Sequence, residues 1–175
     1  MSLTVGILTV SDTCSRGRAE DGSGKALAKL VQEAGWKVEV RAVVPDEARE
    51  IRAIMKEWAD DLRLSLILTT GGTGAGPRDV TPEATEKLLE RALPGLPELI
   101  RREGVKSNPR AALSRGLAGI RGKTLIINLP GSPRGAAESF QAVAGLIPHA
   151  LEVMDGARHD PAAEGHRIGK EHAHG

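Results

Sequence analysis

Three times along the chain, a strand-like run is followed by a loop and then by a helical pattern. The runs occupy residues 3–10, 37–44 and 65–70, and the last is aliphatic and β-branched, as in a buried central strand. In the first repeat, helical spacing places Leu27 and Val31 on one face. Strands joined by helices predict a parallel sheet with right-handed crossovers, and the loops that follow the strands then share its carboxyl edge.

The second half of the chain adds a different pattern. Prolines break the chain after the third helix, and one helical segment remains at residues 98–105. Residues 113–120 and 124–129 are predicted as two strands joined by a glycine turn, which adds an antiparallel pair. The last helix is predicted over residues 135–154, with a kink at Pro148.

Composition limits the classes of function. With 175 residues and 40% hydrophobic content, the chain is long enough for one core and too short for two ordinary domains. A formal net charge of +1 and 2% aromatic residues offer nucleic acid neither an attractive field nor a stacking surface. No apolar run reaches membrane length and no targeting signal opens the chain, so we expect a cytoplasmic protein that binds neither nucleic acid nor membranes.

We therefore expect an α/β fold, a three-layer α/β/α domain over residues 1–155 with a mostly parallel sheet and an added antiparallel strand pair. Residues 156–175 are polar and rich in Gly and His, which predicts a flexible tail. Its histidines, His159, His166, His172 and His174, could capture a metal adventitiously, but we predict no dedicated metal site, because no carboxylate or cysteine completes a geometry around them.

The loop at residues 71–79 carries the strongest chemical signal. Four of its first six residues are glycine, so backbone N–H groups can approach a phosphate closely. A helix follows, with Thr81 as its predicted N-cap and Pro82 at its first position. Asp79 lies ahead of that cap, and a carboxylate beside an anion site repels the anion unless a cation intervenes. The combination predicts Mg²⁺ held between Asp79 and a phosphate.

Two common nucleotide-binding motifs do not match this loop. A P-loop ends in Gly-Lys-Ser/Thr, whereas this loop has Gly-Pro-Arg at residues 76–78, and proline has no N–H to donate. The dinucleotide fingerprint must run directly into a helix, but Pro77 interrupts it. A Walker NTPase and an NAD enzyme are therefore both disfavoured.

Four segments, taken together, resemble the molybdopterin adenylyltransferases of the MogA/MoaB type and especially the G domain of gephyrin. They are residues 10–14 (Val-Ser-Asp-Thr-Cys), 44–47 (Val-Pro-Asp-Glu), 70–84 and 120–132, and the resemblance spans about residues 3–154. It implies transfer of AMP from Mg-ATP to the terminal phosphate of molybdopterin, with release of pyrophosphate. It also implies a homotrimer and leaves room for a separate molybdate-insertion protein as partner.

The resemblance also implies roles for individual residues. Asp46 and Asp79 match the family's two essential aspartates, which we assign to catalysis and metal binding. The matching nucleotide-binding residues are Gly71, Gly72, Thr73, Gly74, Ser11, Asp12, Leu129, Pro130, Gly131 and Ser132. The matching molybdopterin-binding residues are Ser107, Ser114, Arg115 and Asn128. Counter-charges for the two anionic substrates are expected among the arginines Arg78, Arg110, Arg115 and Arg134.

Simpler interpretations of several of these residues stay open. Asp46 follows Pro45 and is consistent with a helix N-cap, and Ser11 is consistent with a plain turn. Ser114 and Asn128 are consistent with strand-end residues that satisfy backbone groups. Two other functions also stay open: a non-catalytic molybdopterin carrier or scaffold, and a nucleotidyltransferase that acts on another phosphorylated small molecule.

Overall fold

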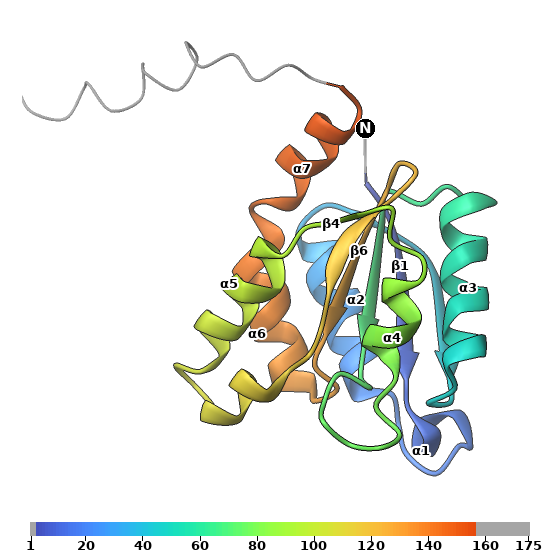
Figure 1. Ribbon diagram of the computed structural model, residues 1–175, viewed down its shortest axis with the longest axis vertical. Helices are drawn as coiled ribbons and strands as arrows, with labels where there is room; N and C mark the ends of the chain where they lie inside the picture. The colour runs from blue at the N-terminus through green and yellow to red at the C-terminus, as the bar shows by residue number, and fades with distance from the viewer. Residues whose placement is uncertain (1–2, 157–175) are drawn as a thin grey trace, which may run out of the picture.

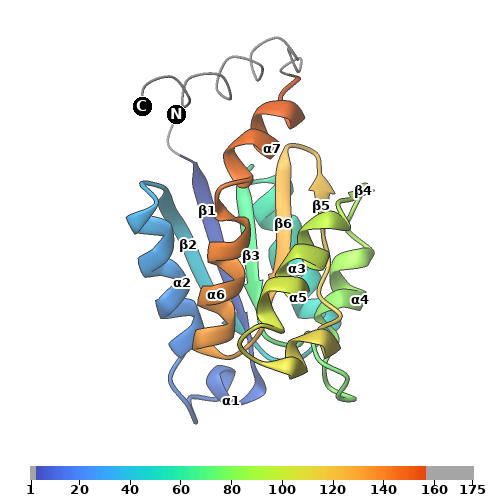
Figure 2. The ribbon, with the colours of Figure 1, turned by 90° about the vertical axis from the view of Figure 1, so that its left-hand side faces the viewer.

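A six-stranded mixed sheet forms the middle layer of the protein (Figure 1). The computed structural model describes residues 3–156. The strand order is β2-β1-β3-β6-β5-β4, as Figure 2 shows from the side. The strands are β1 (Thr4–Val10), β2 (Lys37–Val44), β3 (Leu66–Thr70), β4 (Arg91–Ala92), β5 (Ala118–Arg121) and β6 (Thr124–Leu129).

Four parallel strands bring their carboxyl ends to one edge of this sheet. β1 pairs in parallel with β2 and β3, and β3 pairs in parallel with β6. Val10 lies opposite Val44, and Thr70 lies opposite Leu129, so these strands end at nearly the same level. The chain leaves β1 for β2 on one side and later enters β3 on the other, which is the topological switch point where open α/β sheets bind ligands.

Helices cover both faces of the sheet and complete the α/β/α arrangement. One face packs against α2 (Gly22–Glu33), α5 (Gly95–Gly104), α6 (Pro133–Ala144) and α7 (Ile147–Met154). The other face packs against α3 (Ala48–Asp60) and α4 (Thr81–Glu86). Every residue of β3 and β6 is buried, which fits their mainly aliphatic sequences. The predicted fold class, including the antiparallel β4-β5-β6 edge, is confirmed.

Prolines account for two differences from the predicted boundaries. Residues 113–120 were expected to form one strand, but the 3₁₀-helix η1 (Pro109–Leu113) comes first and β5 begins only at Ala118. The Asn108 side chain accepts a hydrogen bond from the Arg110 N–H and thereby caps η1 (3.1 Å). The expected kink at Pro148 is a complete break, because α6 ends at Ala144 and Pro148 lies in the first turn of a new helix, α7.

The start of α4 also differs from the sequence expectation. Val80, not Thr81, is its N-cap residue, and it makes no side-chain cap. The Thr81 hydroxyl instead donates to the Gly71 carbonyl at 2.9 Å, across the glycine loop. Thr81 is fully buried, so this side chain fastens both ends of the loop to each other rather than capping the helix.

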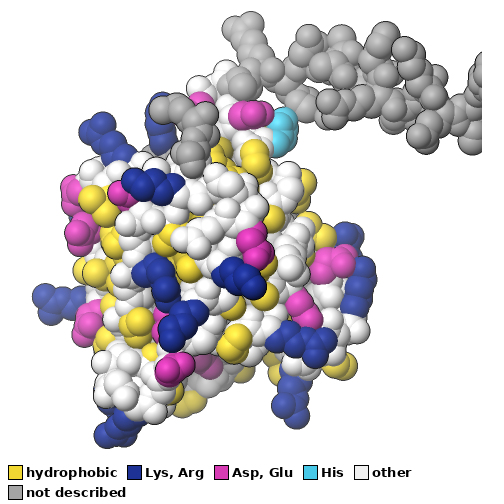
Figure 3. Space-filling model, turned by 180° about the vertical axis from the view of Figure 1, so that it is seen from behind, with side chains coloured by type: hydrophobic (Ala, Val, Ile, Leu, Met, Phe, Trp, Pro, Cys, Tyr) yellow, Lys and Arg dark blue, Asp and Glu magenta, His cyan; other side chains and the backbone are white. Residues whose placement is uncertain are grey.

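The surface carries mixed charges. Figure 3 shows Lys and Arg interspersed with Asp and Glu over the face seen from behind. No helix within residues 3–156 has the length and apolar character needed to cross a membrane. The predicted flexible tail, with its four histidines, lies outside the described residues apart from Gly156.

Candidate active site

The loops after β1 and β2 are joined by a reciprocal pair of hydrogen bonds. The Asp12 N–H donates to Asp46 Oδ2 at 2.9 Å, and the Asp46 N–H donates to Asp12 Oδ1 at 3.1 Å. Asp46 is therefore not the helix N-cap that its position after Pro45 allowed; that position belongs to Glu47. Ser11 does cap a helix, the short α1 (Asp12–Ser15), by accepting from the Cys14 N–H at 3.2 Å.

Arg78 connects the glycine loop to these two loops. Its Nε and Nη2 donate to the two carboxylate oxygens of Asp12 at 3.0 Å each, and Nη2 also reaches Glu47 Oε1 at 3.0 Å. These hydrogen bonds from Arg78, together with the one from the Asp46 N–H, lower the pKa of Asp12. Three loops that lie far apart in the sequence are thus fixed to one another at the carboxyl edge.

Close packing explains why the glycine loop begins with Gly71. Its φ is +100°, and a methyl group on its Cα would lie 2.2 Å from the Val10 carbonyl oxygen. The Gly71 N–H donates to the Leu129 carbonyl at 3.1 Å, so the loop leaves the sheet between the ends of β1 and β6. Only glycine fits where three strand ends meet so closely.

Two carboxylates flank this loop. Asp79 accepts a hydrogen bond from the Gly76 N–H at 2.8 Å, and a methyl group at Gly74 would lie 2.9 Å from Asp79 Oδ2. On the other side, a methyl group at Gly72 would lie 3.2 Å from Asp46 Oδ1. The glycines therefore make room for the two aspartates as well as for a ligand.

These two aspartates have no cationic partner within residues 3–156, in contrast to their neighbours. Arginines pair with the carboxylates Asp12, Glu47, Glu83 and Glu138. Burial raises the pKa of Asp46, and the charges of Asp12 and Asp79 act in the same direction, whereas the hydrogen bond from the Asp12 N–H and the charge of Arg78 act against this rise. Among the described residues, neither Asp46 nor Asp79 forms an ion pair, so both carboxylates are available to a cation.

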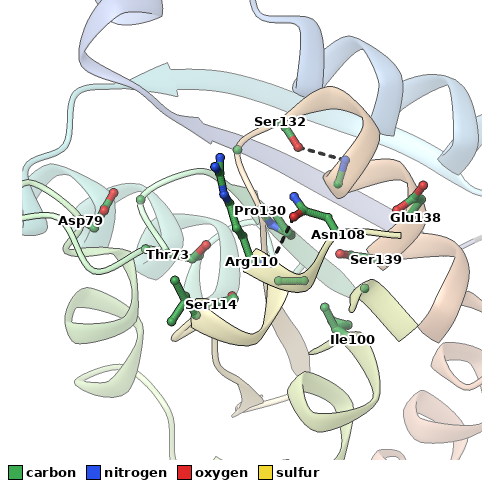
Figure 4. A pocket seen from close by; sticks show the side chains of 17 residues that line it. Thr73, Asp79, Ile100, Asn108, Arg110, Ser114, Pro130, Ser132, Glu138 and Ser139 are labelled. Carbon is green, nitrogen blue, oxygen red and sulfur yellow. Dashed lines mark hydrogen bonds between the residues drawn. The ribbon is translucent and has the colours of Figure 1, made fainter. Parts of the chain in front are cut away.

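A cavity of about 370 Å³ adjoins the glycine loop (Figure 4). Its walls come from the loop itself, from α5 and η1, and from the turn that precedes α6. It contains the predicted site residues Gly72, Thr73, Gly74, Asp79, Ser114, Pro130, Gly131 and Ser132. The Ser132 hydroxyl accepts from the Gly135 N–H at 3.0 Å and so caps α6 at the cavity wall.

Arg110 contributes a free positive charge to this cavity. Figure 4 shows its side chain extending from η1 over the cavity. Of the four arginines expected as counter-charges, the other three are paired with carboxylates, whereas the Arg110 guanidinium has no carboxylate partner among residues 3–156. An arginine without a partner in a cavity is suited to bind an anionic ligand.

Comparison with known proteins agrees with this geometry. The family model described as "Probable molybdopterin binding domain" matches residues 6–149. The chain belongs to this molybdopterin-binding family of the MogA/MoaB type. A protein of Helicobacter pylori strain 26695 named molybdopterin adenylyltransferase is 41% identical over 157 residues, which cover 89% of each chain.

A longer relative and a solved structure show the same likeness. The Drosophila melanogaster molybdenum cofactor synthesis protein cinnamon is 48% identical over 154 residues, but the matched part is only 26% of its length. The chain thus spans about a quarter of that protein. The crystal structure of the molybdopterin biosynthesis enzyme MoaB from Thermus thermophilus has a TM-score of 0.84 and 51% identity, and the match covers 89% of this chain and 98% of that one.

Within this molybdopterin-binding domain, several predicted site residues lie outside the cavity wall. Ser107 lines a neighbouring groove, which shares Glu138 with the cavity. Asn128 is 3% exposed: its Nδ2 donates to the hydroxyls of Thr69 (2.9 Å) and Thr85 (3.0 Å), and its Oδ1 accepts from the Leu117 N–H. The others that do not line the cavity are Ser11, Asp12, Asp46, Gly71, Leu129 and Arg115.

Apart from Arg110 and Ser114, sequence reasoning missed the part of the cavity formed by the α5 and η1 segment. Ile100, Gly104, Asn108 and Leu113 line it, together with Glu138 and Ser139 of α6. Apart from Asn108, none of these residues carries a local motif. The available signal was Asn108-Pro109, a cap followed by a proline, which marks a chain reversal that could have been placed beside the glycine loop.

Proposed function

We propose that this domain is a molybdopterin adenylyltransferase of molybdenum cofactor biosynthesis, the activity for which its H. pylori relative is named. In this reaction AMP passes from Mg-ATP to the terminal phosphate of molybdopterin, and pyrophosphate leaves. One observation carries the assignment: Asp46 and Asp79 have no cationic partner in the described chain and flank a glycine loop at a topological switch point. That combination suits a nucleotide bound together with a metal ion.

Magnesium fits the donor set of this chain. Residues 3–156 contain no group of three or more His, Cys, Asp or Glu side chains that could hold a metal alone. Mg²⁺ is typically bound by one or two carboxylates together with substrate phosphates and water, so Asp46 and Asp79 would be sufficient protein ligands. When bound, the ion would neutralise charge on the triphosphate while the bond between the α-phosphorus and the oxygen that leaves with pyrophosphate breaks.

The chain's own groups would bind and orient the two substrates. Gly72, Thr73 and Gly74 line the same cavity as the turn that leads into α6, and the N–H groups of these three loop residues would receive phosphates. Arg110 supplies the counter-charge for the phosphate of molybdopterin. That phosphate has a second pKa of about 6 and is mostly ionised at neutral pH, so the reaction needs no side chain to remove a proton.

Pyrophosphate release tests this assignment. Purified protein is incubated with Mg-ATP, with and without molybdopterin, and both pyrophosphate and adenylylated molybdopterin are measured. We expect release that requires both substrates. Molybdopterin binding without turnover would identify a carrier or scaffold, and turnover only with another phosphorylated acceptor would identify a different nucleotidyltransferase.

Assembly and partners are also part of the proposal. The family resemblance supports a homotrimer in the cytoplasm, with a separate protein that inserts molybdate into the product. Light scattering on the purified protein should give three times the chain mass of 18.5 kDa. A monomer at working concentration would contradict the trimer.

A further inference from the structure

Arg115 contacts the glycine loop at several separate points. It lies between η1 and β5, and its backbone N–H donates to the Thr73 carbonyl at 2.8 Å. Its side chain donates from Nε to the Gly74 carbonyl at 2.7 Å and from Nη2 to the Asp79 carbonyl at 2.8 Å. The same guanidinium pairs with Glu83 in the first turn of α4.

This set of contacts spans most of the loop. Thr73 and Gly74 lie near its beginning and Asp79 near its end, so one side chain links the two halves. Further anchors are the Thr81 contacts with Gly71 and Gly72 and the short Asp79–Gly76 bond. Glycine-rich segments lose much conformational freedom on ordering, so a loop that is ordered before the ligand binds needs such contacts to hold it.

The charge of Arg115 is already used by the protein. Its guanidinium is paired with Glu83, and the residue does not line the cavity. The carbonyl oxygens that it binds carry partial negative charge and would repel phosphates if they turned toward the ligand. Because the Arg115 side chain donates hydrogen bonds to these carbonyl oxygens, they stay directed toward Arg115 and away from the ligand. A lysine could not replace it, because a single ammonium lacks the planar fork that reaches separated acceptors.

We propose that Arg115 is a positioning residue: it holds the glycine loop ready for the nucleotide and does not bind molybdopterin. This assignment rests on the proposed function for the identity of the ligand, but not for the effect on the loop. It replaces the role in molybdopterin binding that the family resemblance implied. The distinction is measurable, because the two roles affect different substrates.

The test uses the full-length protein and two variants of this contact. Arg115→Met keeps most of the side-chain length and removes every side-chain donor, whereas Glu83→Gln leaves Arg115 in place and removes its charged partner. Arg134→Met is the matched control, because Arg134 lies on α6 near the cavity and pairs only with Glu138 among the described residues. Amide hydrogen exchange of residues 72–80 is measured without ligand, and calorimetry gives Kd for Mg-ATP and for molybdopterin.

We expect Arg115→Met to speed exchange in residues 72–80 at least tenfold and to raise Kd for Mg-ATP about tenfold, equivalent to about 1.4 kcal/mol. Kd for molybdopterin should stay within about twofold of wild type. Glu83→Gln should change the same quantities in the same direction but less, and it keeps the test decisive if Arg115→Met fails to fold. Arg134→Met should leave loop exchange unchanged.

Two results would overturn the proposal. Unchanged loop exchange in both Arg115→Met and Glu83→Gln would show that this contact does not order the loop. Weakened molybdopterin binding with unchanged Mg-ATP binding would restore Arg115 as a substrate ligand. If the wild-type protein binds no Mg-ATP at all, the proposed function fails, and the exchange experiment on the unliganded protein still decides whether Arg115 holds the loop.

Discussion

Replacing Asn128 by alanine should lower the stability of the protein rather than simply weaken substrate binding. Both hydrogens of the Asn128 amide are donated to buried threonine hydroxyls, and its oxygen accepts from the Leu117 N–H. Alanine leaves that N–H without its partner, at about 1–3 kcal/mol, and removes two further hydrogen bonds at about 0.5–1.5 kcal/mol each. We expect the free energy of unfolding to fall by about 2–6 kcal/mol, and Tm by about 4 °C or more.

Urea unfolding and thermal melting of Asn128→Ala measure this loss, with Asn108→Ala as the matched control. Asn108 is exposed, and the one hydrogen bond that its side chain makes among the described residues caps η1, so removing this side chain should cost about 1 kcal/mol or less. Molybdopterin affinity, measured well below the lowered Tm, should change little, because one lone pair on Asn128 is all that remains for a ligand. Stability within about 0.5 kcal/mol of wild type, together with at least tenfold weaker molybdopterin binding, would refute the structural role.

Four further expectations follow from the site and the chain ends. Asp79→Asn should retain an acceptor for the Gly76 N–H and change the free energy of unfolding by less than about 0.5 kcal/mol. AMP transfer by this variant should fall by orders of magnitude and recover partly at high Mg²⁺. Full turnover per folded molecule would contradict the metal role. Burial raises the pKa of Asp46 above 3.8, so the acid-side fall in activity should occur at a pH above that value, and added Mg²⁺ should move this fall to lower pH. The same shift makes the contribution of Asp46 to the free energy of unfolding decrease as pH rises through its pKa. Asp46→Asn should abolish both effects, as measured by pH-rate and pH-stability profiles. Arg110→Gln should raise Kd for molybdopterin about tenfold, as measured by calorimetry, and leave Tm nearly unchanged; equal affinities would remove Arg110 from the site. Deleting residues 156–175 should leave Tm and turnover nearly unchanged, and a loss of several degrees would show that the tail packs on the protein.

Local signals were sufficient for most of the fold. β2 has the predicted bounds, and β1 and β3 each begin one residue after the predicted start, because these runs show clear strand patterns between turn residues. Errors occurred where a residue satisfies a distant partner. Thr81 looked like a helix cap, but its hydroxyl serves the Gly71 carbonyl ten residues earlier. A single sequence without a known fold does not reveal such a contact.

The candidate site shows the same difference between local signals, which the sequence reveals, and contacts with distant partners, which it does not. Glycine spacing and the position of Asp79 predicted an anion site with a metal from the residues alone, whereas the other roles came from resemblance. Neither source showed which charges are paired. Asn128 forms bonds with side chains 59 and 43 positions away, and Arg78 with one 66 positions away, so their partners depend on the assembled sheet.

Charge pairing at the carboxyl edge distinguishes residues that fix the loops from residues that are available to a ligand. Arg78 and Arg115 are both paired with carboxylates, and each fixes loops that meet around the glycine segment. Neither guanidinium is free to meet a triphosphate without breaking contacts that hold those loops. Asp46 and Asp79 would repel the same triphosphate. A divalent cation, as proposed above, would resolve both constraints, because it would neutralise the two aspartates and the phosphates together without disturbing either arginine. Mg²⁺ should therefore order the nucleotide while the loops stay in place, so Mg-ATP binding should change loop exchange far less than Arg115→Met does.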